Sequence, residues 1–513
     1  MTPSSSSGAG PGRGWLGLRP ATLACLVAIA VLLVPLSLLS QPADSVSPGG
    51  KLARLRTDHG LSQADLGSID PAGEAIRFAT LGLKNVAVTL LWDRANHYKK
   101  VEDWTSLSAT LEQLTKLQPN FYSVWDFQAH NLSYNISVEF DDYHDRYAWV
   151  IKGIEFLRDG IWLNRREPRL LGRMGWFLGH KIGKSDEKKQ FRRLFKADDD
   201  FHKRDREERT LPERDNWLVA REKYLAGQEL VDKQGVPLKT TALIFHSEPM
   251  MTAINHARAL EEDGTFGTQA RDAWTLAGDE MRRFATHEIP TSWDVPISLG
   301  RREEQEALAA QRATELEEHL PGAFAALAER RREALPTAQR AALDTPPAER
   351  TEEQQRLAAE AEAAVQVTWL EVAREAPPEK RKKALRLARE HEEARETATI
   401  IDRYRDIVNF DFWRATCEAE VTPPAIEFRE QAWVGDREYR GARLQAAKEA
   451  YERAFAAWRQ VLDAAPRLRD DQITADDTAD LVRRYRKVLE QLDEPFPKSF
   501  ILQDVIDKAA PVE

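Results

Sequence analysis

The chain has 513 residues, a formal net charge of -10 and 14 tryptophans. Charged residues make up 30% and aromatic residues 8% of the sequence. The apolar content is ample for a core, which excludes disorder along the whole chain. The acidic balance excludes a general nucleic-acid binder, because binding to phosphates needs a basic face. We therefore expect no nucleic-acid partner.

The N-terminal region predicts a membrane anchor. Residues 1–19 are rich in Ser, Gly and Pro and are expected to form a disordered cytoplasmic tail. Pro20–Pro42 contains no charge, and its apolar core is long enough for a bilayer span of about 20 residues. Because Arg13 and Arg19 precede it, the body of the protein is expected outside the cytoplasm, at the inner (plasma) membrane. A cleaved secretory signal is the alternative.

After a polar linker over 43–73, the spacing of apolar residues predicts antiparallel helices over 74–299. Leu107, Leu111 and Leu114 fall on one face of a helix expected over 104–117, with Asp103 as its N-cap. The helix at 121–136 repeats the pattern from Trp125 and Ala129 onward. A small residue among bulky ones lets a neighbouring helix approach closely. The fold class is therefore expected to be all-α.

These residues resemble tetratricopeptide (TPR) repeats, whose period is about 34 residues. With Pro119 as the late proline of one repeat, Ala95 falls at the small position and Tyr98 at a later aromatic position. Trp125 and Ala129 take the corresponding positions in the next frame. Near the C-terminus, Ala442, Ala454, Trp458 and Val461 precede Pro466 at similar spacings. The resemblance implies a TPR-like solenoid with a concave binding face. The chain is also similar to uncharacterised, membrane-anchored proteins of bacterial cell envelopes, which implies no reaction.

The region 300–399 differs from the rest in composition. Ala, Glu, Arg and Leu dominate it and aromatic residues nearly vanish, which predicts an inserted helical hairpin or short coiled coil. Large apolar residues return over 400–494, where a second TPR-like part is expected to pack on the first. Residues 495–513 form the expected C-terminal tail. Homo-oligomer formation through 300–399 is a further expectation.

No catalytic motif is found, and no cofactor is expected. The sequence contains no phosphate-binding glycine loop, no Gly-x-Ser-x-Gly and no His-Glu-x-x-His. The best group of metal-ligand types lies just before a helix: Glu139, Asp141, Asp142, His144 and Asp145. Oxygen ligands with one imidazole could hold a divalent cation. Acidic residues at this place also favour the helix dipole, and capping is the preferred interpretation.

Three weaker groups are interpreted as structural. Asp198, Asp199, Asp200 and His202 lie in a charged run over 184–214 that is expected to be a solvated helix-loop stretch. His246 and His256 have no third ligand within reach in the sequence. The tryptophans at 92, 125, 149, 162 and 176 have helical spacing, which is typical of core residues rather than of an aromatic ligand box.

The leading hypothesis is a single-pass, membrane-anchored helical-repeat protein that binds a protein or peptide and has no catalytic activity. A second hypothesis, from a different functional class, is an envelope enzyme or metal-binding protein that uses Glu139–Asp145. A third hypothesis is a structural scaffold that self-associates through 300–399.

Overall fold

The computed structural model describes residues 84–206, 209–291 and 295–510, with a few scattered positions before residue 56. Regular structure in these residues is helical, apart from one isolated bridge between Ile289 and Ile297. This confirms the all-α class and is compatible with a helical-repeat fold. The chain divides into two compact units. The first is Met1–Met174 with Asp232–Val236, and the second is Gly175–Val231 with Pro237–Glu513.

Only scattered positions of the predicted membrane span, Pro20–Pro42, are among the described residues. In the part of the chain that the structure does describe, no helix has both the length and the apolar character needed to cross a bilayer.

The first unit is a series of helices that pack on their neighbours in sequence. They are α4 (Lys84–Lys100), α5 (Trp104–Leu117), α6 (Tyr122–His130), α7 (Tyr143–Leu163) and the start of α8 (Pro168–Trp176). A π-helical turn, Asn131–Ile136, continues α6. The expected bounds of α5 and its cap are confirmed, because Asp103 accepts a hydrogen bond from the backbone N–H of Ser106 at 3.0 Å.

Glycines set the close approach of α6 and α7 in this unit. The Trp125 ring lies against Gly160, where an added Cβ would be 2.6 Å from the ring. At Gly153, also on α7, the backbone of Ala129 and the side chain of Ser133 occupy the position that a Cβ would take. Ala129 is itself buried, as its place between bulky residues predicted. The small residues among bulky ones therefore mark the places where α6 and α7 approach each other closely.

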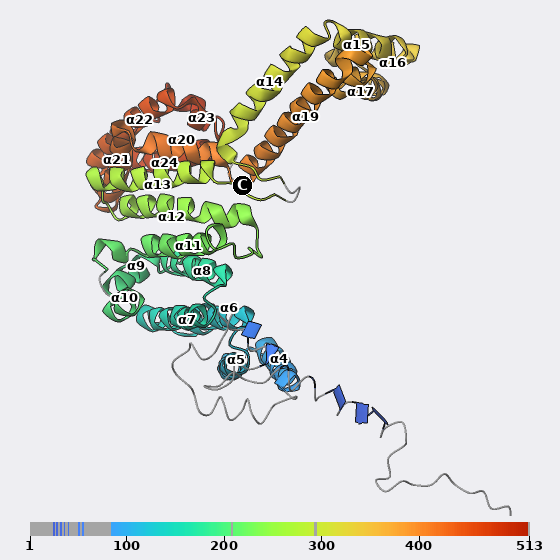
Figure 1. Ribbon diagram of the computed structural model, residues 1–513. Helices are drawn as coiled ribbons and strands as arrows, with labels where there is room; N and C mark the ends of the chain where they lie inside the picture. Colours follow the sequence, from blue (N-terminus) through green and yellow to red (C-terminus); the bar gives the residue numbers. More distant parts are fainter. Residues whose placement is uncertain are drawn as a thin grey trace, which may run out of the picture. The chain divides into compact units, whose positions relative to one another are not determined.

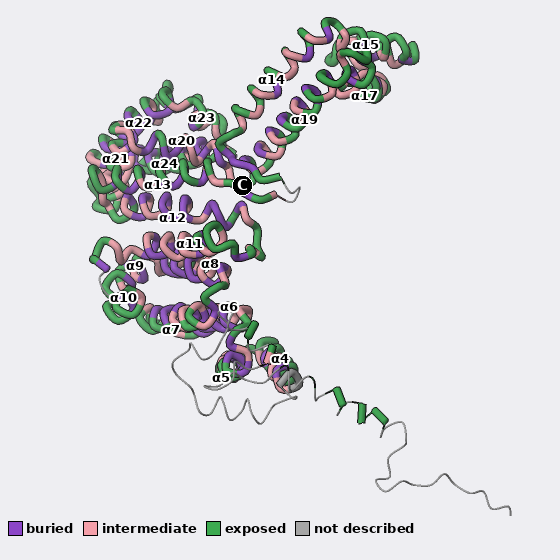
Figure 2. Tube along the Cα trace, in the orientation of Figure 1, coloured by how far each residue is buried: buried purple, intermediate pink, exposed green. Residues whose placement is uncertain are grey.

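The second unit contains the remaining helices (Figure 1). Figure 2 shows many buried residues in α11–α13 and α20–α22. Outside the arm described below they are α9 (Lys188–Ala197), α10 (Asp199–Asp205), α11 (Asn216–Asp232), α12 (Ala242–Glu262), α13 (Thr268–Thr286), α20 (Phe410–Glu420), α21 (Pro423–Arg440), α22 (Leu444–Ala464), α23 (Pro466–Arg469), α24 (Gln472–Gln491) and α25 (Gln503–Ile506). The closest neighbours are α12 with α13 and α21 with α22. In addition, α13 packs on α20 and α12 on α21.

Helices before residue 300 and after residue 399 are therefore in contact within this unit, at α13 with α20 and at α12 with α21. One repeat position differs from the prediction. Ala442 does not lie on a helix but in the tight turn between α21 and α22, with a φ of 56°.

The last turn of α8 and the π-helical turn that follows it, Phe177–Ile182, pack against two aromatic side chains of α11. A Cβ on Gly175 would lie 2.7 Å from the Tyr224 ring, and one on Gly183 would lie 2.4 Å from the Trp217 ring. Gly179, between them, also faces Trp217. Gly175 and Gly179 therefore permit close packing against α11.

Two predictions about local structure are wrong. The charged run over 184–214 is not simply solvated, because Phe191, Phe195 and Phe201 on α9 and α10 are buried. These aromatics form one face of short helices whose other face is charged.

The second correction concerns residues 235–250, for which Pro237 and Pro249 predict a loop or a short extended segment. Residues 242–250 instead form the first turns of α12. A proline inside a helix leaves the carbonyl four residues earlier without its N–H partner. Gln228 of α11 supplies one, since its Nε2 donates to the Phe245 carbonyl at 3.2 Å. A tertiary hydrogen bond therefore permits a helix that the local sequence disfavours.

Helices α14–α19, residues 302–407, are named the arm. They are α14 (Arg302–His319), α15 (Ala323–Glu333), α16 (Thr337–Asp344), α17 (Glu352–Val365), α18 (Trp369–Glu375) and α19 (Pro378–Ile407). α14 and α19 run side by side, and the shorter helices gather at their far end (Figure 1). α19 passes without a break through the expected domain boundary at 399/400.

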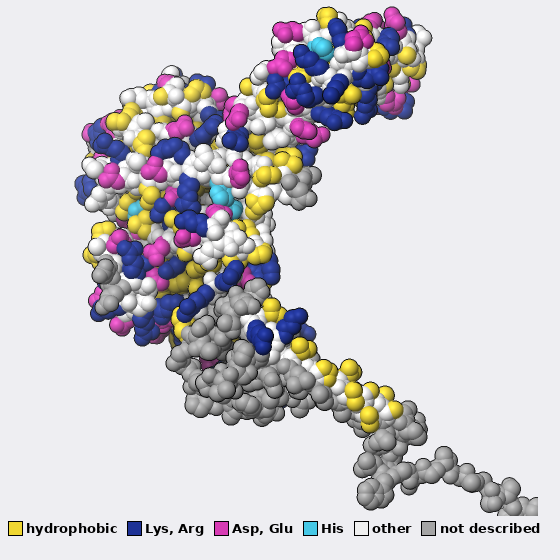
Figure 3. Space-filling model, in the orientation of Figure 1, with side chains coloured by type: hydrophobic (Ala, Val, Ile, Leu, Met, Phe, Trp, Pro, Cys, Tyr) yellow, Lys and Arg dark blue, Asp and Glu magenta, His cyan; other side chains and the backbone are white. Residues whose placement is uncertain are grey.

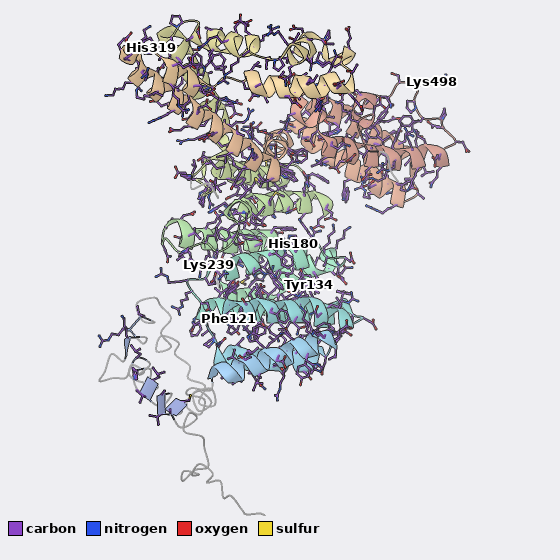
Figure 4. All side chains as sticks on the ribbon, turned by 90° about the vertical axis from the view of Figure 1, so that its right-hand side faces the viewer. Phe121, Tyr134, His180, Lys239, His319 and Lys498 are labelled. Atoms are coloured by element: carbon purple, nitrogen blue, oxygen red, sulfur yellow. The ribbon has the colours of Figure 1, made fainter. Side chains whose placement is uncertain are left out.

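The arm has an apolar cluster of its own, which includes Leu316, Trp369 and Leu387 and draws no residue from outside the arm. His319, labelled in Figure 4, is the last residue of α14 and links it to the beginning of α19. Its Nε2 lies 3.1 Å from the Lys380 carbonyl, and the Lys380 Nζ donates to the His319 carbonyl at 3.0 Å. Both signs of charge mix on the arm surface in Figure 3. The helices of the arm therefore pack mainly on one another.

Candidate functional site

The site predicted from Glu139–Asp145 is a helix start. All five candidate ligands are exposed. Asp142 is the N-cap of α7, and its Oδ1 accepts from the His144 backbone N–H at 2.7 Å. The hydrogen bond from the His144 backbone holds the pKa of the Asp142 carboxyl below its usual value. Among the described residues, no three ligand atoms of this segment converge on one point.

The other groups singled out in the sequence are dispersed. Asp198 is the N-cap of α10, whereas His202 is buried with its Nε2 2.8 Å from the Phe195 carbonyl. His256 lies 2.9 Å from Asp215, and His246 stacks instead on His287. Each named tryptophan has its own partner, so Trp92 contacts Phe121 and Trp125 contacts Phe156. Trp162 is largely exposed.

A cavity that the sequence did not predict lies in the second unit. It has a volume of about 280 Å³ and is bounded by α12, α20, α21, α22 and α24. A neighbouring cavity of about 380 Å³ shares Arg258, Arg429 and Ala432 with it. The two guanidinium groups thus form the wall between the two cavities. We call the first the Arg258 pocket.

The contact of α12 with α21 brings the two arginines together. Gly264 follows α12 with a φ of 83°, and the ring of Trp433 on α21 lies where its Cβ would be, at 2.6 Å. A residue with a side chain would be strained at that φ and would clash with the ring. Gly264 therefore allows α21 to approach the end of α12 that carries Arg258 and Glu261.

Arg429 is committed to an intramolecular ion pair. Its Nε donates to Glu420 Oε1 at 3.1 Å and to Oε2 at 3.3 Å, and its Nη2 also contacts Oε1. Glu420 is only 2% exposed. The guanidinium also lies over the ring of Phe428, which stacks on Trp458 with ring centres 4.3 Å apart. This arrangement gives the pocket an aromatic floor and fixes one of its cations.

Arg258 differs from Arg429 in having no anionic partner at bonding distance. Among the described residues no hydrogen bond or ion pair to its guanidinium is found, and its closest group contact is the ring of Trp413, 4.9 Å away. Burial lowers the pKa of Arg258, and the neighbouring Arg429 lowers it further. A half-buried guanidinium with unused donors is suited to accept an anion.

The carboxylates near the arginines repel one another. Burial raises the pKa of Glu261 to about 7, and the charge of Glu420 adds to the effect. Trp274 Nε1 donates to Glu261 Oε1 at 2.7 Å, which favours the ionised form. At neutral pH the Glu261 side chain is therefore divided between its neutral and charged forms, so the neighbouring cavity, which it lines, loses negative charge as the pH falls.

The arrangement favours binding over covalent chemistry. Cys417 on α20 is the one described nucleophile type near the pocket with a strongly shifted pKa. Burial raises that pKa to about 12, so the thiol stays protonated and is a poor nucleophile. Thr416 and Thr478 use their hydroxyl groups on helix carbonyls, at 2.8 and 2.7 Å.

Comparison with known proteins gives no family: no known family model matches the chain, and no curated protein is similar enough to count as a relative.

Proposed function

We propose that this chain is a membrane-anchored scaffold of helical-repeat type that binds a protein or peptide partner at the cell envelope. In this proposal the Arg258 pocket holds a carboxylate of the partner. The observation that supports it most is the half-buried Arg258 guanidinium, which has no hydrogen bond or ion pair among the described residues and faces a cavity.

A carboxylate is the ligand group that best completes this pocket. Its two oxygens match the fork of guanidinium donors, and it would replace water around a cation whose burial is unfavourable. The aromatic floor of Phe428 and Trp458 can cover the apolar part of the same residue. An Asp or Glu side chain, or a C-terminal carboxylate, on a peptide meets both requirements.

The test is selection of binding peptides from a random phage-displayed library by the full chain. We expect the selected peptides to be enriched in Asp and Glu or to depend on a free C-terminus. Arg258→Gln should weaken their binding by roughly tenfold to a hundredfold, because hydrogen bonds to a charged group contribute about 1.5–3 kcal/mol. Titration by fluorescence anisotropy measures the change.

Arg282→Gln is the matched control, since Arg282 is exposed and pairs with Asp279 away from the pocket. It should bind the selected peptides like the parent protein. Equal binding by Arg258→Gln would remove the pocket from the proposal. A library that yields no peptide at all would count against the peptide-binding function itself.

The membrane anchor is part of the same proposal and is supported by the sequence of Pro20–Pro42. We expect alkaline phosphatase, which is active only outside the cytoplasm, to be active when fused after Glu513. Activity of a cytoplasmic reporter at the same place would contradict the orientation. A mature N-terminus near Gln41 would show a cleaved signal in place of an anchor.

A further inference from the structure

A second feature of the second unit, remote from the pocket chemistry, is a pair of histidines. His246 lies near the start of α12, and His287 caps the end of α13. The two ring centres are 4.0 Å apart with planes at 34°, and one nitrogen of each ring lies within 4.8 Å of one nitrogen of the other. The packing of α12 on α13 brings the two rings together.

The imidazole of His246 has a ring nitrogen without a hydrogen bond. Its residue is 5% exposed, and its Nδ1 is buried without a hydrogen bond. A buried ring nitrogen left unpaired is unfavourable unless another group satisfies it. The ring packs edge-on against Phe245, which gives contact but no hydrogen bond. The pair therefore contains an unsatisfied nitrogen directed into a protein interior.

The protonation state agrees with a ligand role. Burial lowers the pKa of His246 to about 3, and the charges of His287 and Arg283 act in the same direction. His246 is thus a neutral imidazole over the physiological range, which is the form that coordinates metal ions.

The positive charge of Arg283 would repel a cation bound at this pair, but its guanidinium group already interacts with other side chains. Its Nη2 donates to Gln228 Oε1 at 2.6 Å, and its Nη1 lies 3.5 Å from Glu280 Oε2. The Glu280 carboxylate is buried and compensates part of the positive charge. Arg283 therefore weakens a metal site without filling it.

We propose that His246 and His287 form a two-imidazole site for a divalent transition-metal ion. His287 is only half-buried, so water can complete the coordination from its side. Imidazole suits Cu²⁺, Ni²⁺ and Zn²⁺, whereas Mg²⁺ and Ca²⁺ prefer oxygen ligands. Cu²⁺ should bind most tightly, in accordance with the usual order of affinities. This inference does not depend on the Arg258 pocket.

The test is titration of the chelator-treated full chain with Cu²⁺, Ni²⁺, Zn²⁺ and Mg²⁺ by calorimetry. We expect one saturable site for Cu²⁺, weaker binding of Ni²⁺ and Zn²⁺, and none of Mg²⁺. His246→Gln and His287→Gln should each lower Cu²⁺ affinity by roughly a hundredfold, because losing one imidazole abolishes chelation. His256→Gln is the control, since His256 lies on the same helix but is held by Asp215.

Electron paramagnetic resonance of the Cu²⁺-loaded parent protein gives an answer even if a variant fails to fold. Nitrogen hyperfine structure from two imidazoles is expected. A spectrum without nitrogen ligands, no saturable Cu²⁺ binding, or unchanged affinity in the double His246/His287 variant would overturn the proposal.

Discussion

Replacing Trp125 by alanine should lower the free energy of unfolding of the first unit by about 3–5 kcal/mol, the usual range for truncating a large buried aromatic. The indole is 5% exposed and packs on Phe156 with ring centres 4.8 Å apart. Its Nε1 donates to the Pro119 carbonyl at 2.8 Å. The substitution removes both the packing against Gly160 and this hydrogen bond, so the gap between α6 and α7 cannot close without a shift of either helix.

Hydrogen exchange of α6 and α7 amides measures the loss locally, which suits a chain of two units whose unfolding need not be two-state. Trp162→Ala is the control, because that ring is 45% exposed. It should change the same exchange rates by the equivalent of about 0.5 kcal/mol or less. Similar effects of the two substitutions would contradict the close packing described for Trp125.

Replacing Arg429 by methionine should destabilise the second unit by about 3–5 kcal/mol at neutral pH, as expected when one partner of a buried ion pair is removed. The variant leaves Glu420, which is 2% exposed, without its hydrogen-bond donor. It also deprives Glu261 of a nearby cation that lowers its pKa. The charge of Glu420, which already raises the pKa of Glu261, would then be less compensated.

The loss should depend on pH in a definite direction. The pKa of Glu261 is about 7 in the folded protein against 4.5 for the ordinary group. The folded state therefore holds a proton that the unfolded state releases, and stability contributed by Glu261 falls as the pH rises from about 4.5 to about 7. Removing Arg429, whose charge lowers the pKa of Glu261, raises that pKa further, so Arg429→Met should be least harmful near pH 5 and most harmful near pH 8.

Melting temperatures of the parent and variant proteins at both pH values test this. Adding Glu420→Gln to Arg429→Met should recover part of the stability near pH 8, because an amide carries no charge. A loss of equal size at both pH values would show that Arg429 stabilises by packing on Phe428 and Trp458 and not by charge.

The helices were largely predictable where the signal is local. Asp103 and Pro119 bracket α5, and the apolar face between them has a clear helical period, so its bounds follow from the sequence alone. The start of α12 was not predictable, because the carbonyl that Pro249 leaves free is satisfied by Gln228 of another helix. Local sequence reasoning treats Pro249 as a helix breaker and cannot identify a hydrogen-bond partner on another helix.

The candidate site was not predictable for a related reason. Arg258 and Glu261 on α12 look like an ordinary charged pair three residues apart. They become part of a candidate site only because the fold brings Glu420 of α20 and Arg429 of α21 near them. Likewise, His246 was considered with His256 on the same helix, whereas its partner in space is His287. The one available cue was that charged residues interrupt an apolar helix face, which does not identify their partners.

The place of the arm in the sequence has a consequence for the order of folding. α13 ends at Thr286 and its neighbour α20 begins at Phe410, so the ribosome must synthesise the whole arm before the two can meet. An unfolded segment of that length would make the encounter slower, because closing a longer loop has a larger entropic cost. Because the arm has its own apolar cluster and its helices pair with one another, it can form first and bring its two ends together. Translation would then present α20 to α13 across a short gap, and the pocket would be completed last, when α24 leaves the ribosome.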